Sequence, residues 1–289
     1  MLGELKVLFM PNYRLLDIKY LLLHKIWLKL LSKIKKNGVG VFYVKWSNNF
    51  GDMLTPVILK YYGFTPFYEY PAKSSVISIG TILSIVGNDW NGYVVGSGWN
   101  RFEECRFPKA VFLGVRGFLT KKYLGLENVV IGDPALIMPI IYPVNAKKKF
   151  KVGLIPHESE VSDIRVCSLI SGDLNCKLIL PNRTNPIEVI KDICDCEYIL
   201  SSSLHGLILS DAYGIPNVRI KFNELDEFDD FKFKDYYSSL GENLHTLTIS
   251  GTEKLDDLMK QTRLANSDII KSIQKNIDQM FISLKSILK

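Results

Sequence analysis

Short apolar, β-branched runs alternate with helical stretches along most of this chain, and this alternation restricts the possible folds more than any other feature. Parallel strands need crossover connections, which are usually helices, so the alternation predicts an α/β fold built on parallel sheets. Before residue 142 the expected strands are 39–46, 76–80, 93–98, 110–115 and 129–132, and the expected helices are 52–62, 81–86 and 117–124.

A polar segment at residues 142–149 interrupts this alternation. Pro143, Asn145 and the lysines at 147–149 are typical of an exposed linker. Two Rossmann-like units in tandem are therefore expected, over residues 1–145 and 150–252, followed by helices over 253–289. In the second unit the expected strands are 150–156, 177–180, 197–201 and 218–220, and the expected helices are 186–194 and 204–213.

The C-terminal tail has the clearest helical pattern. Its apolar residues recur at steps of three and four after a possible cap at Asn266 or Ser267. One face of this helix should pack on a core. The residues of that face are Ile269, Ile270, Ile273, Ile277, Met280, Phe281, Leu284 and Leu288.

Composition and charge exclude several classes of protein. Of the 289 residues 47% are hydrophobic and 23% are charged, which excludes a mainly disordered chain. The formal net charge of +6 favours anionic partners but does not indicate nucleic-acid binding. The five cysteines include no CxxC pair and no zinc-site spacing, so we expect Cys194 and Cys196 to be buried thiols in a reducing compartment.

Residues 13–36 form a strongly apolar stretch that six lysines interrupt, so it fails as a membrane span. Two interpretations remain open for this amphipathic segment: a helix lying on an anionic membrane surface, or a helix packed on its own domain. Glu4 and Lys6 lie in the first apolar stretch, which shows no small-residue cleavage site. We therefore expect a cytoplasmic protein without a secretory signal.

Polar residues and glycines follow several expected strands. Ligands of doubly wound sheets bind beyond the carboxyl ends of the strands, so these residues are candidates for a site. Arg116 is either a planar fork for a carboxylate or phosphate or a surface arginine. Asp52 and Asp133 are either catalytic carboxylates or residues that cap a helix or form a turn, and His157 is an anion ligand or a loop histidine with local hydrogen bonds. The candidates are Asn49, Gly51 and Asp52, then Ser97, Arg116, Asp133 and His157.

The most informative segment is 198–206, where an expected strand runs through three serines directly into a helix. The N–H groups of the first helical turn and the hydroxyls of Ser202 and Ser203 then converge, which suits an anion. The helix dipole disfavours the charged form of His205, whereas a bound anion favours it and makes the imidazole a competent acid near neutral pH. The alternative is that Ser203 only caps the helix and His205 hydrogen-bonds to the backbone.

Taken in order, these segments resemble the polysaccharide pyruvyl transferase family, especially its branch in bacterial exopolysaccharide synthesis. Residues 49–52, Asn-Phe-Gly-Asp, look like the family's NxGD signature, and residues 201–208 with 211–216 carry the strongest resemblance. The resemblance extends from about residue 48 to residue 241. Further similar motifs lie at 79–83, 96–98, 115–117, 132–135, 155–157 and 231–237.

This resemblance implies a two-domain architecture similar to GT-B glycosyltransferases, with phosphoenolpyruvate as donor and a sugar of a surface polysaccharide as acceptor. The implied product is a pyruvate ketal, and no cofactor or metal is required. His205 would be the proton donor, and Asp52 or Asp133 would take the proton of the attacking hydroxyl. The implied donor-binding residues are Arg116, His157, Ser202, Ser203, Leu204, Gly206 and Lys232, and the implied acceptor-binding residues are Asn49, Gly51 and Ser97.

Many relatives carry an arginine at the position of Ser203, so another cation is expected to bind the donor here. Two other functions remain open. Residues 206–216 are also similar to the donor-binding helix of GT-B enzymes that use nucleotide sugars, and a non-catalytic sugar- or anion-binding protein is the third reading. If the acceptor is lipid-linked, segment 13–36 would dock at the inner face of the cytoplasmic membrane. The candidate cations are Arg116, Lys232, Arg183 and Arg219.

Overall fold

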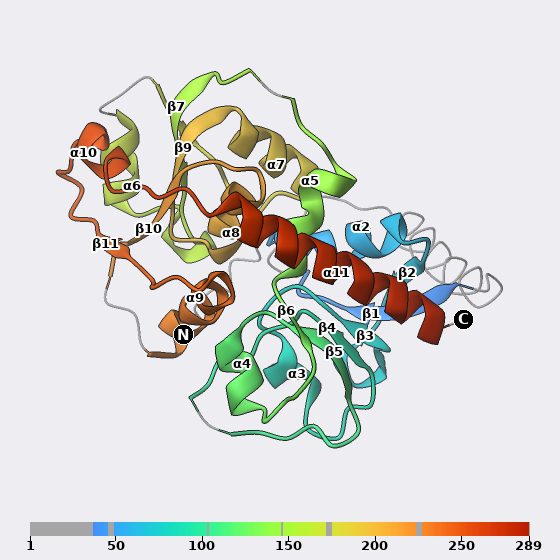
Figure 1. Cartoon of the computed structure of the whole chain (residues 1–289). Coiled ribbons are helices and arrows are strands. Elements are labelled where there is room, and N and C mark those ends of the chain that lie inside the picture. Colours follow the sequence, from blue (N-terminus) through green and yellow to red (C-terminus); the bar gives the residue numbers. More distant parts are fainter. Residues whose placement is uncertain are drawn as a thin grey trace, which may run out of the picture.

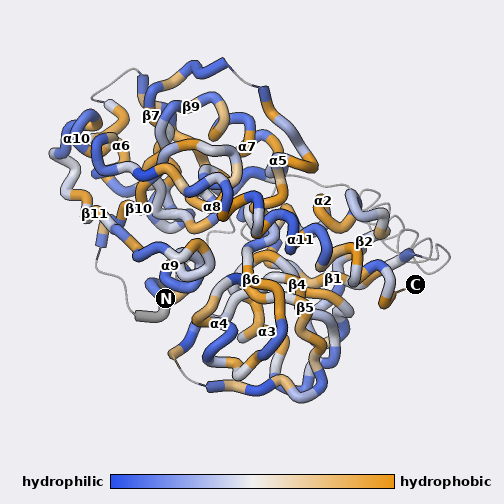
Figure 2. The backbone as a smooth tube through the Cα atoms, in the orientation of Figure 1, coloured by the Kyte–Doolittle hydropathy of each residue, from blue (hydrophilic) through white to orange (hydrophobic). Residues whose placement is uncertain are grey.

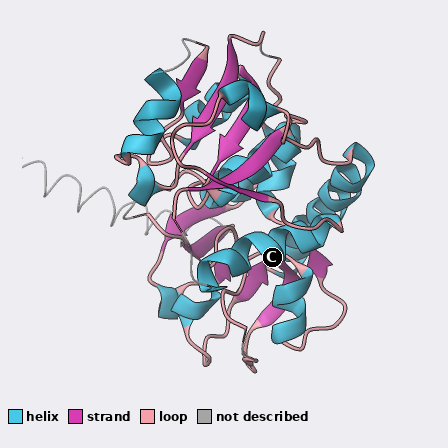
Figure 3. Ribbon diagram, turned by 90° about the vertical axis from the view of Figure 1, so that its left-hand side faces the viewer, coloured by secondary structure: helices cyan, strands magenta, loops and turns pink. Residues whose placement is uncertain are grey.

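The computed structural model describes residues 37–45, 49–102, 104–145, 147–171, 175–223 and 227–288. Within them the chain forms two parallel β-sheets, which lie in different parts of the molecule with helices around them (Figures 1 and 3). The predicted α/β fold class with parallel sheets is confirmed. The amphipathic segment 13–36 lies outside the described residues.

The first sheet has the strand order β2-β1-β3-β4-β5-β6, and all its strands are parallel. Helices α2 (Leu54–Tyr61), α3 (Leu83–Val86) and α4 (Phe118–Tyr123) belong to its connections. The strands are β1 (Gly38–Phe42), β2 (Thr65–Tyr68), β3 (Val76–Ile77), β4 (Tyr93–Val95), β5 (Val111–Val115) and β6 (Val130–Ile131).

The second sheet has the order β11-β10-β9-β7-β8 and is also parallel throughout. The chain reaches it from β6 through η2 (Pro134–Ile137) and α5 (Met138–Ile141). Its strands are β7 (Phe150–Ile155), β8 (Cys176–Leu178), β9 (Cys196–Ser201), β10 (Asn217–Lys221) and β11 (Thr246–Thr248). Its helices are η3 (Glu158–Glu160), α6 (Ile164–Ser171), α7 (Pro186–Cys194), α8 (Leu204–Ala212), α9 (Glu227–Leu240) and α10 (Leu255–Met259).

In each sheet the strand order reverses beside the strand that comes first in the chain. β1 lies between β2 and β3, and β7 lies between β8 and β9. The connections leave these strands in opposite directions, which opens a crevice at the carboxyl ends where ligands of such sheets bind. Each half of the molecule therefore has one topological switch point.

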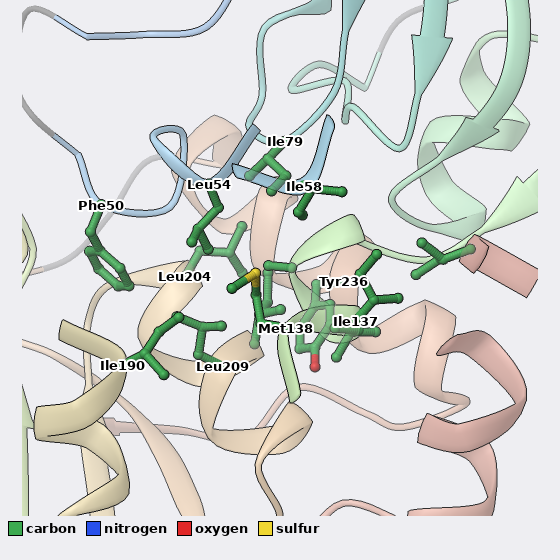
Figure 4. Packing of buried hydrophobic residues seen from close by; sticks show 14 of the residues in the cluster. Phe50, Leu54, Ile58, Ile79, Ile137, Met138, Ile190, Leu204, Leu209 and Tyr236 are labelled. Carbon is green, nitrogen blue, oxygen red and sulfur yellow. The ribbon is translucent and has the colours of Figure 1, made fainter. Parts of the chain in front are cut away.

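A hydrophobic cluster joins the two sheets. Val41 and Val76 of the first sheet and Ile155 and Ile199 of the second all belong to it. Residues adjacent to these in the strands belong to two other clusters, so both faces of each sheet are buried. Figure 4 shows part of the shared cluster, in which Leu54 of α2 approaches residues of α8, and Figure 2 shows hydrophobic residues gathered inside both parts of the molecule.

Helix α11 (Ser267–Ile287) returns from the second sheet to the first and packs on β5, β6 and η2. Its first turn is capped by Asn266, whose Oδ1 accepts the N–H groups of Asp268 at 2.9 Å and Ile269 at 3.4 Å. The predicted cap and packed face are confirmed, although Ile269 itself lies on the exposed side. No helix among the described residues is long and apolar enough to cross a bilayer.

The structure also contains elements that the apolar pattern did not predict, including β2, α5, α6, α9 and β11. Strand β2 contains Pro66, and it is an edge strand, where proline is tolerated. Helix α9 buries residues on several sides, including Phe231, Phe233 and Tyr236, so it lacks the one-sided pattern that identifies a surface helix. Cys194 and Cys196 are buried thiols, as predicted.

Candidate active site

One pocket lies where the loops from both switch points meet. Its volume is about 180 Å³, and it is bordered by the loops after β1, β3, β7 and β9 and by α9. The segments that the sequence singled out therefore converge between the two sheets. The residues that line the pocket are Val44, Asn49, Asp52, Gly80, Thr81, Ile82, His157, Ser203, Leu204, His205 and Lys232.

Gly51 brings the loop after β1 into contact with His205. The side chain of Asn49 accepts a hydrogen bond from the Gly51 N–H at 3.0 Å, which tightens the turn. A Cβ added at Gly51 would lie 1.9 Å from Nδ1 of His205, so only glycine lets the imidazole lie against this backbone. The ring of Phe50 meets the imidazole edge-on, with the ring centroids 6.3 Å apart.

Asp52 precedes α2, and its carboxyl group lies against Gly80 from the loop after β3. A Cβ added at Gly80 would lie 2.0 Å from Oδ1 of Asp52, and Gly80 has a φ of +102°, so this position requires glycine for two reasons. Oδ1 of Asp52 is buried without a hydrogen-bond partner. Helix α2 has no side-chain cap, so the capping interpretation of Asp52 is wrong.

Serine hydroxyls shape the turn from β9 into α8. Oγ of Ser201 accepts the N–H of Ser203 at 3.0 Å and lies 3.0 Å from the carbonyl oxygen of Ile155. A Cβ added at Gly206 would lie 2.3 Å from the same Oγ, so glycine allows α8 to approach β9 closely. Ser203 occupies the N-cap position without a side-chain cap hydrogen bond and borders the pocket, so its capping interpretation is wrong.

Ser202 fixes the loop after β7 beside this turn. Its Oγ accepts the N–H of His157 at 2.8 Å, and its hydroxyl hydrogen-bonds to the carboxylate of Glu160. Nδ1 of His157 lies 2.8 Å from Oγ of Ser159 and caps η3. The interpretation of His157 as a loop histidine with local hydrogen bonds is confirmed, and the same residue borders the pocket.

The imidazole of His205 is neutral in this structure at ordinary pH. Burial, followed by the positive charges of Arg116 and Lys232, lowers the pKa of His205 to about 3. Its Nε2 is buried and has no hydrogen-bond partner. Oδ2 of Asp133 lies 3.9 Å from this atom, beyond hydrogen-bond distance. An anion in the pocket would offset the two cations and raise the pKa of the imidazole.

The two carboxyl groups near His205 differ in protonation. Burial and the charge of Asp133 raise the pKa of Asp52 to about 8, so Asp52 is mostly protonated at pH 7. Burial raises the pKa of Asp133 less, to about 6, because the Ala135 N–H donates to its Oδ1 at 2.9 Å and Arg116 is nearby. The hydrogen bond to Ala135 caps η2, so the capping interpretation of Asp133 is confirmed.

Lys232 is the candidate cation that borders the pocket. Its charge lowers the pKa values of both Asp52 and His205. By contrast, Arg183 pairs with Asp192 and Arg219 with Asp230, and neither arginine is among the lining residues. Of the four cations that could replace the family arginine, the pocket geometry therefore favours Lys232.

Arg116 is fully buried behind the pocket wall, so its interpretation as a surface arginine is wrong. Its Nε donates to Oδ2 of Asp235 at 2.9 Å, and its Nη1 donates to Oγ1 of Thr81 at 2.6 Å. Thr81 lines the pocket, whereas Arg116 does not. Arg116 therefore acts on the site indirectly: it holds the hydroxyl of Thr81, and its positive charge lowers the pKa of His205.

The predicted site residues fall into two layers. The lining layer contains Asn49, Asp52, His157, Ser203, Leu204, His205 and Lys232. The supporting layer contains Gly51, Ser97, Arg116, Asp133, Ser202 and Gly206. Ser97 is typical of the second layer, because its hydroxyl donates to the carbonyl oxygen of Gly80 at 2.9 Å. Sequence reasoning gave no role to Val44, Gly80, Thr81 and Ile82, although Thr81 directly follows the expected strand 76–80.

A comparison with known families decides the kinship of this chain. The sequence model described as polysaccharide pyruvyl transferase matches residues 9–223, which include strands of both sheets. The chain belongs to the polysaccharide pyruvyl transferase family. The region that the family model matches contains every residue that lines the pocket except Lys232.

Two known proteins are similar to this chain over more than half of its length. Succinoglycan biosynthesis protein ExoV of Rhizobium meliloti (strain 1021) is 25% identical over 230 residues, which cover 76% of this chain and 70% of ExoV. Uncharacterized protein L143 of Acanthamoeba polyphaga mimivirus is 27% identical over 180 residues, which cover 56% of this chain. The alignment spans 59% of the length of that viral protein.

Proposed function

We propose that this chain transfers pyruvate from phosphoenolpyruvate to a sugar of a bacterial capsular or exopolysaccharide repeat unit, forming a pyruvate ketal and releasing phosphate. The convergence of His205, Asp52 and Lys232 in one pocket between the two switch points carries the proposal. Membership of the family and the likeness to a succinoglycan biosynthesis protein support the same reaction class.

We assign the donor to the second half of the chain and the acceptor to the first. In this proposal the halves are the two Rossmann-like domains of a GT-B-like architecture, residues 1–145 and 150–252, with the last helices over 253–289. The amino-terminal end of α8, Ser203 and Lys232 suit the anionic groups of phosphoenolpyruvate. Asn49 and Asp52 border the same pocket from the acceptor side.

The reaction moves one proton from a sugar hydroxyl to the methylene carbon of phosphoenolpyruvate. The hydroxyl oxygen bonds to C2 while C3 accepts a proton and becomes a methyl group. The C2–O bond to phosphate then breaks, a second hydroxyl bonds to C2, and its proton leaves with the phosphate. The site must therefore supply an acid for C3, a base for the hydroxyl and cations for the departing phosphate.

His205 supplies the acid in this proposal. The imidazole is neutral until the donor arrives, and the donor's negative charge then offsets Arg116 and Lys232 and favours the imidazolium. Asp133, which is mostly ionised at neutral pH, favours the same charged form from 3.9 Å.

Asp52 is the carboxyl group assigned to the sugar hydroxyl, because it lines the pocket and Asp133 does not. Its raised pKa makes its ionised form a stronger base than an ordinary carboxylate.

Phosphate release from phosphoenolpyruvate tests this function. The acceptor probe is the glycan fraction of cells that lack this protein, and mass spectrometry should show the gain of one pyruvate less one water on one sugar. His205→Ala should abolish the release, whereas His245→Ala, which changes an exposed histidine far along the sequence, should not. Release of UDP or GDP from a nucleotide sugar, with phosphoenolpyruvate untouched, would instead establish a glycosyltransferase.

A lipid-linked acceptor remains part of the proposal through segment 13–36. Flotation of the chain with liposomes that contain anionic lipids tests this contact. Replacing the lysines of the segment by glutamine should abolish flotation, and unchanged flotation would refute a contact through this segment.

A further inference from the structure

Helix α9 belongs in sequence to the second half but also packs against the first. Its residue Phe231 is buried in a hydrophobic cluster whose other buried members belong to the first half of the chain, and its ring contacts Phe102 at 4.8 Å between centroids. The next residue, Lys232, borders the pocket. Asp235, one turn further, is fully buried at the contact with α4. The same helix thus carries a pocket cation and a buried carboxylate.

Asp235 accepts hydrogen bonds from two residues of the first half. Its Oδ1 accepts the N–H of Thr120 at 2.8 Å, and its Oδ2 accepts Oγ1–H of Thr120 at 2.7 Å and Nε–H of Arg116 at 2.9 Å. Both side chains of the Arg116–Asp235 ion pair are fully buried. Asp235 therefore caps the first turn of α4 and neutralises a buried arginine at once.

Close backbone approach makes this arrangement possible. A Cβ added at Gly117 would lie 1.8 Å from the carbonyl oxygen of Asp235, and one added at Gly98 would lie 2.2 Å from Cζ of Arg116. Beyond the ion pair, Arg116 donates to Oγ1 of Thr81 at 2.6 Å and to the carbonyl oxygen of Trp99 at 3.1 Å. The hydrogen-bond chain from Asp235 thus ends at a residue that lines the pocket.

We propose that Asp235 is a positioning residue of the donor pocket, where its carboxylate fixes Thr81 through Arg116 and Lys232 through α9. This inference rests on the proposed function for its effect on phosphoenolpyruvate, but the placement of Lys232 can be measured without any substrate. Replacing Asp235 by asparagine removes the charge that balances Arg116 and turns one of the two oxygens that accept from Thr120 and Arg116 into an amide NH2 donor. Thr81 and Lys232, which line the pocket, should then both lose their fixed positions.

Chemical labelling measures the position of Lys232 directly. Acetylation of the chain with acetic anhydride, followed by peptide mass spectrometry, should show Lys232 reacting about tenfold faster in Asp235→Asn than in the wild type. Lys254, an exposed lysine outside α9, is the internal control and should not change in either variant. Asp230→Asn, an aspartate on α9 that pairs with Arg219, is the matched variant and should leave labelling of Lys232 unchanged.

The second readout is the dissociation constant of phosphoenolpyruvate, measured by calorimetry below the unfolding temperature of each variant. Asp235→Asn should weaken binding about tenfold. The double variant Arg116→Met with Asp235→Leu replaces the buried ion pair by apolar side chains and should recover thermal stability without recovering affinity.

A folded Asp235→Asn variant with wild-type labelling of Lys232 would overturn the inference, as would full recovery of affinity in the double variant. A wild-type chain that does not bind phosphoenolpyruvate would refute the proposed function, while the labelling would still decide the role of Asp235.

Discussion

The substitution Gly51→Ala tests the site through a single methyl group. The added Cβ would lie 1.9 Å from Nδ1 of His205, whereas ordinary contact begins near 3.4 Å. The imidazole or the loop after β1 must therefore move by about 1.5 Å, and a displacement of about 1 Å in a catalytic group can cost about 100-fold in rate. We expect kcat/KM for phosphate release from phosphoenolpyruvate to fall about 100-fold or more.

Gly40→Ala is the matched control for this change. Gly40 lies in β1, ahead of the loop that contains Gly51, and a Cβ there would first meet the ring of Phe67 at 3.4 Å, an ordinary contact. This variant should keep wild-type kcat/KM. Circular dichroism of both variants checks that they are folded. A folded Gly51→Ala variant with wild-type turnover would refute the claim that His205 acts from the position seen here.

Three further predictions follow from the same structure. Asp52 loses its proton near pH 8. Above this pH its negative charge should weaken the binding of anionic phosphoenolpyruvate, while its ionised form should raise kcat by acting as the base. Calorimetry and initial rates measure the two trends, and Asp52→Asn should abolish both. Between about pH 4 and 8 the folded chain keeps the proton of Asp52, whereas the unfolded chain has lost it, so the free energy of unfolding falls as the pH rises through this interval. Asp52→Asn should make this fall smaller, and urea titrations at several pH values can measure it. Asn266→Ala removes the cap of α11 and should cost about 1 kcal/mol in thermal unfolding without changing turnover.

Regular apolar patterns gave the correct fold class because buried parallel strands and one-sided helices leave a periodic record in the sequence. Helix α7 occupies residues 186–194 as predicted, and α11 follows its expected cap. Segments that obey other constraints were missed. Strand β2 contains Pro66, which is tolerated because β2 lies at the edge of its sheet. Helix α9 contacts both halves of the molecule, so it has no single apolar face.

The candidate site was predictable where residues lie in the loop or helix that follows a strand, as Asp52 does after β1 and His205 after β9. The division between lining and supporting residues was not, because it depends on distances between segments far apart in the sequence. Arg116 illustrates this limit: its position after a strand suggested a ligand for an anion, but its partner Asp235 lies 119 residues away in the chain. Only the folded chain shows that the carboxylate of Asp235 already pairs with the guanidinium of Arg116.

The central claim is that the pocket around His205 and Lys232 takes phosphoenolpyruvate. Calorimetric titration of the chain with phosphoenolpyruvate, in parallel with UDP-glucose, tests it most directly. We predict saturable binding of phosphoenolpyruvate that Lys232→Met weakens strongly, and no binding of UDP-glucose. Binding of UDP-glucose without phosphoenolpyruvate, or affinity for phosphoenolpyruvate that Lys232→Met leaves unchanged, would contradict the account.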